Sequence, residues 1–199
     1  MSKQRVVVYT DYKSPYAYVA NKALFALERT HDVELEWLPY TLRIAEYLDS
    51  VDTRTPHNWR KVRYAYMDAR RYANEQGLTL KGPKRIYDAT YASAGMLFAQ
   101  RNGFFRAYHD TVFEMFWSHQ LDLDVLDEMV ALITSLGGDA AAFEAYATGP
   151  ARAEVDAITT HAESIGVFGV PMMVLDGELF WGGDRIDMLA KRLRQHAAS

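Results

Sequence analysis

Cysteine is absent from this chain of 199 residues. The absence excludes disulfides, thiolate metal sites and a cysteine nucleophile supplied by the protein itself. The histidines do not compensate, because none of them occurs at a ligand spacing such as His-x-x-x-His. They are His31, His57, His109, His119, His161 and His196. We therefore expect no metal site.

Long apolar runs and an excess of basic charge are also missing. No run approaches the roughly 20 apolar residues of a membrane span, and residues 1–5 lead into a strand rather than into the apolar part of a signal peptide. The net charge of −4 gives no electrostatic footprint for DNA or RNA. Basic residues do cluster between 60 and 71, but the apolar stripe through that segment favours a solvated helix face. We expect a cytoplasmic protein with no nucleic-acid or membrane partner.

The residues that are present have an ordinary globular composition, with 49% apolar and 24% charged side chains. Residues 5–10 predict a buried, valine-rich strand, residues 15–29 an amphipathic helix, and residues 33–40 a second strand with alternating apolar side chains. Because a helix connects the two strands, we expect them to pair in parallel.

The pattern changes after residue 44, since no strand is evident before residue 166. Helical spacing or end signals mark segments 59–77, 88–101, 104–117, 124–136, 139–148 and 150–165, the last with Pro150 in its first turn. Strands return at 172–175 and 179–181, joined by a turn at Asp176-Gly177. Residues 184–196 predict a last helix with Asp184 as its N-cap. The fold class is thus α/β, ordered as β-α-β, a block of helices, and β-β-α.

The segment Asp11-Tyr12-Lys13-Ser14-Pro15-Tyr16-Ala17 follows the first strand and begins the first helix. Serine is a favoured N-cap and proline a favoured first helical residue, so Ser14 and Pro15 are explicable as a helix start alone. The same geometry would point backbone N–H groups and the positive end of the helix at a ligand in the loop. A downstream segment, Phe168-Gly169-Val170-Pro171, favours this second interpretation.

In this element order, the two segments resemble the thioredoxin fold, and the helical block resembles the insertion of its disulfide-oxidase (DsbA-like) branch. In that branch a Cys-x-x-Cys opens the first helix, and a proline with a cis peptide bond faces it. The corresponding residues 14–17 contain no thiol, so dithiol redox chemistry is excluded. The resemblance implies a thioredoxin-like domain (1–45 and 167–199), an inserted helical domain (46–166) and a cis bond between Val170 and Pro171.

The relatives that remain use glutathione: kappa-class glutathione transferases and, with greater similarity, 2-hydroxychromene-2-carboxylate isomerases. The resemblance covers nearly the whole chain. It rests on Asp11-x-x-Ser14-Pro15-Tyr16-x-Tyr18, Phe113-x-x-x-Trp117, residues 167–171, Trp181-Gly182-Gly183-Asp184-Arg185 and Met188-Leu189. Two positions depart from the family pattern: no asparagine precedes Pro56, and Gly183 stands where the isomerases carry an asparagine.

The resemblance implies glutathione as the cofactor. Ser14 would contact its sulfur, Val170 and Pro171 its cysteinyl part, and Gly183 and Asp184 its γ-glutamyl end. Such a site has to stabilise a thiolate, because a thiol with a pKa of about 8.5 is only a few per cent ionised at neutral pH. A hydroxyl donor at a helix N-terminus suits that task.

We expect an aromatic small-molecule substrate to approach from the helical insertion, over Tyr16, Phe113 and Trp117, with Lys61 or Arg85 at its carboxylate. The expected function is that of a glutathione-dependent isomerase acting on an aromatic-catabolism intermediate such as 2-hydroxychromene-2-carboxylate. Two alternatives stay open: a kappa-like glutathione transferase, and a non-catalytic DsbA-like module that binds a small molecule or partner. A homodimer also stays open.

Overall fold

The computed structural model describes residues 3–197, and its centre is a four-stranded sheet with the strand order β2-β1-β3-β4. The strands are β1 (Gln4–Thr10), β2 (Val33–Pro39), β3 (Met172–Leu175) and β4 (Glu178–Trp181). Strand β1 pairs in parallel with β2 and antiparallel with β3, which pairs antiparallel with β4. Val6 and Val8 of β1 are completely buried. The parallel pairing of β1 with β2 and the hairpin of β3 and β4 confirm the sequence prediction.

Helix α1 (Pro15–Thr30) connects β1 to β2, and the predicted block of helices lies between β2 and β3. Its members are α2 (Ile44–Leu48), α3 (Pro56–Glu75), α4 (Thr90–Arg101), α5 (Phe105–Trp117), α6 (Leu126–Ser135), α7 (Ala140–Thr148) and α8 (Ala151–Ser164). A 3₁₀ turn, η1 (Gly183–Arg185), and α9 (Ile186–Ala197) follow the hairpin. The sequence analysis missed α2, because five residues are too few for a helical pattern. Pro150 is the N-cap of α8 rather than part of its first turn.

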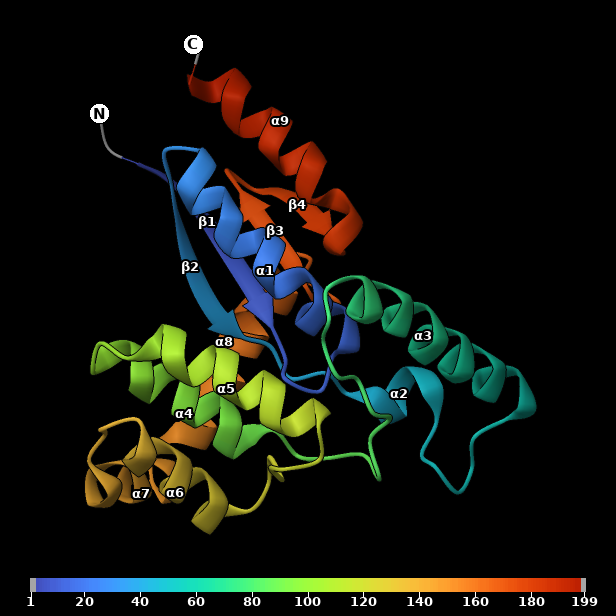
Figure 1. The fold of residues 1–199 in the computed structure, drawn as a ribbon, viewed down its shortest axis with the longest axis vertical. Helices are drawn as coiled ribbons and strands as arrows, with labels where there is room; N and C mark the ends of the chain where they lie inside the picture. Colours follow the sequence, from blue (N-terminus) through green and yellow to red (C-terminus); the bar gives the residue numbers. More distant parts are fainter. Residues whose placement is uncertain (1–2, 198–199) are drawn as a thin grey trace.

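The helices cover the sheet on both faces (Figure 1). Helices α1 and α9 contact each other on one face, while α8 contacts β2 and passes behind the sheet. Helix α3 packs beside α1, and α4 to α7 form a separate layer below. One hydrophobic core runs from Val8 in the sheet through Tyr18 in α1 to Trp117 in α5. The division into two domains stays a prediction.

The turn between β3 and β4 has the backbone that its sequence indicates. Asp176 and Gly177 both have positive φ angles, of 49° and 82°. A two-residue hairpin turn of type I′ requires this conformation at both central positions, and Asp-Gly is one of its preferred pairs. The hairpin holds β3 against β1 and thereby fixes the position of the Val170-Pro171 segment that precedes β3.

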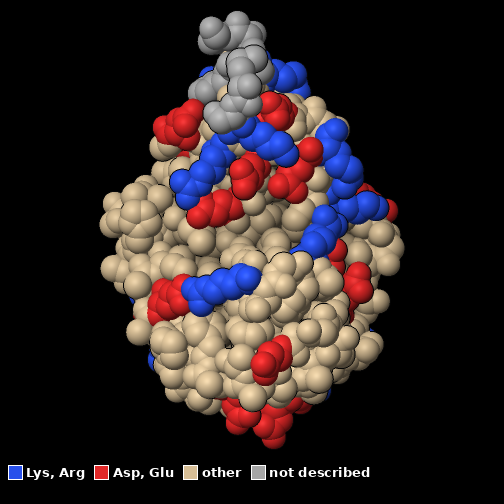
Figure 2. Space-filling model, turned by 90° about the vertical axis from the view of Figure 1, so that its left-hand side faces the viewer, with Lys and Arg blue, Asp and Glu red and all other residues tan. Residues whose placement is uncertain are grey.

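The surface shows mixed charge. On the face drawn in Figure 2, Lys and Arg side chains lie among Asp and Glu side chains at the end that carries α9, and a wide area with few charged side chains lies below them. None of the helices within residues 3–197 combines the length and apolar character that a membrane span requires. In the same part of the chain, no three His, Asp or Glu side chains are grouped as a metal site would need.

Candidate active site

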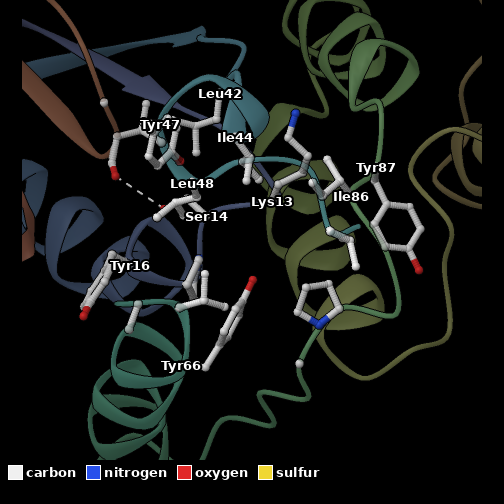
Figure 3. A pocket seen from close by; sticks show the side chains of 18 of the residues that line it. Lys13, Ser14, Tyr16, Leu42, Ile44, Tyr47, Leu48, Tyr66, Ile86 and Tyr87 are labelled. Carbon is white, nitrogen blue, oxygen red and sulfur yellow. Dashed lines mark hydrogen bonds between the residues drawn. The ribbon is translucent and has the colours of Figure 1, made fainter. Parts of the chain in front are cut away.

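A pocket of about 790 Å³ opens beside the N-terminus of α1 (Figure 3). One wall comes from Lys13, Ser14, Pro15 and Tyr16, together with the segment 168–170 and Trp181. The other walls come from residues between Leu42 and Tyr87, which include α2 and part of α3, and from Phe116 of α5. Segments about 150 residues apart in sequence (14 and 170) therefore meet at one cavity.

Ser14 is buried and both caps α1 and faces the Val170 segment. Its Oγ accepts a hydrogen bond from the Ala17 N–H at 3.1 Å and donates to the Val170 carbonyl at 3.4 Å. Pro15 occupies the first helical position. The capping prediction is confirmed, but capping uses only an acceptor lone pair of the hydroxyl. The proton remains available, because its present bond is long and easily exchanged for a better acceptor.

Val170 lines the pocket next to Ser14, and the Val170-Pro171 peptide bond is cis, as the resemblance implies. Within residues 3–197 nothing accepts a hydrogen bond from the Val170 N–H, although the residue is buried. Buried backbone N–H groups are almost always paired. The group is therefore a donor without a protein partner at the edge of the cavity. Pro171 is buried and does not line the pocket.

Lys13 is an almost fully buried cation that lines the pocket. Its ammonium lies 3.2 Å from the Asp11 carboxylate, and the two side chains are 5% and 1% exposed. Asp11 is also bound by backbone groups, because Oδ1 accepts from the Lys13 N–H at 2.9 Å and Oδ2 from the Leu42 N–H at 2.8 Å. The pair ties the start of α1 to the segment after β2.

The other charges around the pocket are all positive. Arg54, Arg63, Arg70, Lys84 and Arg85 line it, and no carboxylate of the described residues does. Arg85 is engaged by Asp124 and lies over the ring of Tyr87, with 4.1 Å from its guanidinium carbon to the ring centre. Lys61 does not line the pocket. In a chain of net charge −4, such a lining selects an anionic ligand.

The aromatic wall differs from the one that the sequence analysis expected. Tyr16 lines the pocket, but Phe113 and Trp117 are completely buried and do not. They lie four residues apart on α5, so they share one face of the helix, and both stack on Tyr18. Phe116 of the same helix reaches the cavity instead. This burial corrects the expectation that Phe113 and Trp117 contact the substrate.

The tyrosines of the wall stay protonated at neutral pH. Burial, followed by the hydrogen bond to Asp68 at 3.1 Å, raises the pKa of the Tyr16 hydroxyl well above its usual range. Burial also raises the pKa of Tyr66 to about 12.

At the rim, Phe168 and Trp181 are largely exposed and meet edge to face, with ring centres 4.8 Å apart. Both were missed as site residues, because exposure of an aromatic side chain leaves no mark in the sequence pattern.

Gly183 and Asp184 lie in η1, outside the lining of the pocket. Asp184 is not an N-cap: its carboxylate pairs with Arg185 at 2.6 Å, and no side-chain capping bond is present in η1. The 3₁₀ turn precedes α9 and takes the place of the predicted helix start. Gly183 packs against α1, where an added Cβ would lie 3.2 Å from the Cβ of Ala20.

A buried polar chain lies directly behind the site. Tyr12 hydrogen bonds to His109 Nδ1 at 3.0 Å, and His109 Nε2 to the side-chain Oδ1 of Asn21 at 3.1 Å. The Asn21 amide donates to Asp110 at 2.9 Å. Burial, reinforced by Arg106, lowers the pKa of His109 to about 3. The neutral ring therefore donates from Nε2 and accepts from the Tyr12 hydroxyl, which anchors the residue next to Lys13.

The fold and this arrangement correspond to a known class of protein. A family model described as a DSBA-like thioredoxin domain matches residues 5–194, and the chain belongs to that class. Within it, a 2-hydroxychromene-2-carboxylate isomerase from Pseudomonas putida is 30% identical over 184 residues, which cover 91% of this chain and 90% of the relative. The chain is a member of the 2-hydroxychromene-2-carboxylate isomerase family.

Solved structures agree with this placement. A 2-hydroxychromene-2-carboxylate isomerase structure superposes with a TM-score of 0.80 at 26% identity, covering 97% of this chain and 96% of the other. The cytosolic disulfide reductase DsbM from Pseudomonas aeruginosa, solved with GSH, has a TM-score of 0.65 at 17% identity, with coverages of 98% and 100%. The second likeness concerns the fold alone.

Proposed function

We propose that the protein is a glutathione-dependent isomerase that acts on an aromatic carboxylate of the 2-hydroxychromene-2-carboxylate kind. The observation that carries the proposal is Ser14, a capping serine with its hydroxyl proton still available at the edge of a cationic pocket. The names of the relatives supply the reaction class.

The residues present fit glutathione. The unpaired N–H of Val170 suits a backbone-like acceptor such as the cysteinyl carbonyl of the tripeptide. A lining with several cations and no described carboxylate suits a ligand with carboxylates and a thiolate. When bound, glutathione supplies a thiolate nucleophile. The fold is one in which DsbM was solved with GSH.

Ser14 has enough interaction energy for this role. Lowering a thiol pKa from about 8.5 to about 6.5 requires about 2.7 kcal/mol in favour of the anion. A hydrogen bond to a charged group contributes about 1.5–3 kcal/mol. The helix N-terminus adds about 0.3–1 kcal/mol, and up to about 2 in a partly buried site. Ser14 does not act as a nucleophile, since no base within its hydrogen-bonding distance could take its proton.

The remaining predicted contacts divide between the two ligands. Tyr16 and Arg85 both line the pocket, and we assign both to the substrate. Gly183 and Asp184 lie beyond the pocket lining, and we retain them for the γ-glutamyl end of glutathione. Lys61 has no place at this cavity.

Ser14→Ala tests the proposal. We expect the pKa of bound glutathione to rise by about 1 to 2, because a charge-assisted hydrogen bond is lost. Turnover of the carboxylate falls accordingly, while glutathione is recovered unchanged, as an isomerase requires. Isothermal titration and the ultraviolet absorbance of the thiolate provide the measurements.

Asp139→Ala is the matched control, because Asp139 caps α7 through the Ala142 N–H at 3.0 Å and lies outside the pocket. Both variants are expected to lose about 0.5–2 kcal/mol of stability. If Ser14→Ala changes neither the pKa of bound glutathione nor turnover relative to Asp139→Ala, so that the two variants differ only in which helix is destabilised, Ser14 is only a cap. Consumption of glutathione during turnover would instead identify a transferase.

A further inference from the structure

We propose that Lys13 binds the carboxylate of the aromatic substrate and makes the enzyme selective for anions. The inference rests on the proposed function and deepens it, because it assigns the role that the sequence analysis gave to Lys61 or Arg85. Lys13 is the cation of the pocket that is buried, and it lies next to Ser14 in the chain.

The hydrogen-bonding capacity of the Lys13 ammonium is mostly unused. An ammonium has three N–H donors, and Asp11 at 3.2 Å is the partner that the described residues supply. Asp11 is shared between this ammonium and two backbone groups, since each of its oxygens also accepts from a backbone N–H. Donors that are buried without acceptors are costly. A carboxylate entering the pocket would supply these acceptors.

Burial also distinguishes Lys13 from the other cations. The interaction of two charges is several times stronger in a desolvated site than at a surface, where water and salt screen it. The side chain of Lys13 is 5% exposed, whereas that of Arg85 is 47% exposed and is bound to Asp124. Arg54 is held by the Leu48 carbonyl at 2.7 Å, and Arg70 by the Leu80 carbonyl at 3.1 Å. These two guanidinium groups are thus already engaged.

The direction of the side chains separates the two ligands. In Figure 3 the Lys13 side chain points away from Ser14, while the Ser14 hydroxyl is directed at the Val170 carbonyl on the other side. A carboxylate at Lys13 therefore leaves the Ser14 side of the cavity to sulfur. Leu42, Ile44 and Ile86 of the same lining provide the apolar contact that an aromatic ring requires.

The test uses trans-cinnamate and its neutral amide, cinnamamide, as probes, with each affinity measured by isothermal titration in the absence of glutathione. In Lys13→Met we expect the Kd of cinnamate to rise about tenfold or more, which corresponds to about 1.4 kcal/mol. The Kd of cinnamamide should stay within about twofold, because its binding does not depend on the ammonium. In a separate titration, the Kd of glutathione should change as little. Lys61→Met is the matched control, since Lys61 is an exposed lysine outside the lining. It should change cinnamate binding less than threefold.

Lys13→Met leaves Asp11 buried without its cation, so the double variant Asp11→Asn/Lys13→Met is measured as well. Replacing a buried ion pair by neutral groups together is tolerated better than removing one partner. The proposal is overturned if either variant binds cinnamate as tightly as the parent, if Lys61→Met shows an equal loss, or if the parent does not distinguish cinnamate from cinnamamide. The cinnamate and cinnamamide titrations contain no glutathione, so they test Lys13 separately from the proposed function. A parent protein that fails to bind glutathione contradicts the proposed function but does not affect the result for Lys13.

Discussion

The buried histidine behind the site makes the stability of the protein depend on pH in a defined direction. Burial, with Arg106 as the second cause, lowers the pKa of His109 to about 3 in the folded chain, against 6.5 as its ordinary value. Below pH 6.5 the unfolded chain therefore binds a proton that the folded chain excludes, and stability is lost as the pH falls. Above pH 6.5 the imidazole is neutral in both states, and its contribution is fully present.

The size of the effect follows from these two values. Between pH 7 and pH 5, protonation of His109 in the unfolded chain should remove about 2 kcal/mol of the free energy of unfolding. His109→Gln lacks the titrating group, so its stability should fall by about 2 kcal/mol less than that of the parent over this range. Urea denaturation at the two pH values measures the difference. His161→Gln, which changes an exposed histidine of α8, should follow the parent.

An equal fall in the parent and in His109→Gln would refute the reasoning. If the variant does not fold, the parent still provides the test through NMR titration of its imidazole groups. The resonance of the His109 ring should then show no protonation above about pH 4, because the ring remains neutral until the pH nears its lowered pKa.

Two further predictions concern residues that the structure relocates. Trp117→Ala truncates a core residue and should cost about 3–5 kcal/mol of stability in urea denaturation. Trp59→Ala, at a partly exposed pocket residue, should cost under about 1 kcal/mol in the same assay. Equal losses would contradict the assignment of Trp117 to the core. Asp184→Ala should weaken glutathione binding in titration without changing the pKa of the bound thiol, because the carboxylate would exchange Arg185 for the γ-glutamyl ammonium. Asp187→Ala is its control, and unchanged binding in Asp184→Ala would remove the residue from the ligand site.

Much of the fold could be predicted because its signals are local. Valine-rich alternation located β1, and Asp176-Gly177 located the hairpin through a turn that needs two positive φ angles. Ser14-Pro15 located the start of α1, since capping depends on neighbours within three residues. The family resemblance then implied the cis bond at Val170-Pro171.

The site was harder to predict because it depends on which way each helix face turns. Phe113, Phe116 and Trp117 are equally aromatic, and only packing on Tyr18 decides that Phe116 reaches the pocket. The burial of Lys13 also has no local signal, because its partner Asp11 is bound by Leu42, a residue far along the chain. A charged residue beside the key serine looks like a solvated one until tertiary structure covers it.

The origin of the pocket walls bears on how such an enzyme acquires new substrates. One side of the pocket is built by residues 13–16 and 168–170, whereas much of the opposite side comes from residues 42–87. Substitutions in the second region can reshape the cavity for a different ring system without altering the cap of α1 or the peptide at Val170. Drift in that region supplies diversity while the residues around Ser14 stay the same. For directed evolution, a library confined to residues 42–87 would vary that side of the cavity and leave Ser14 and its neighbours unchanged.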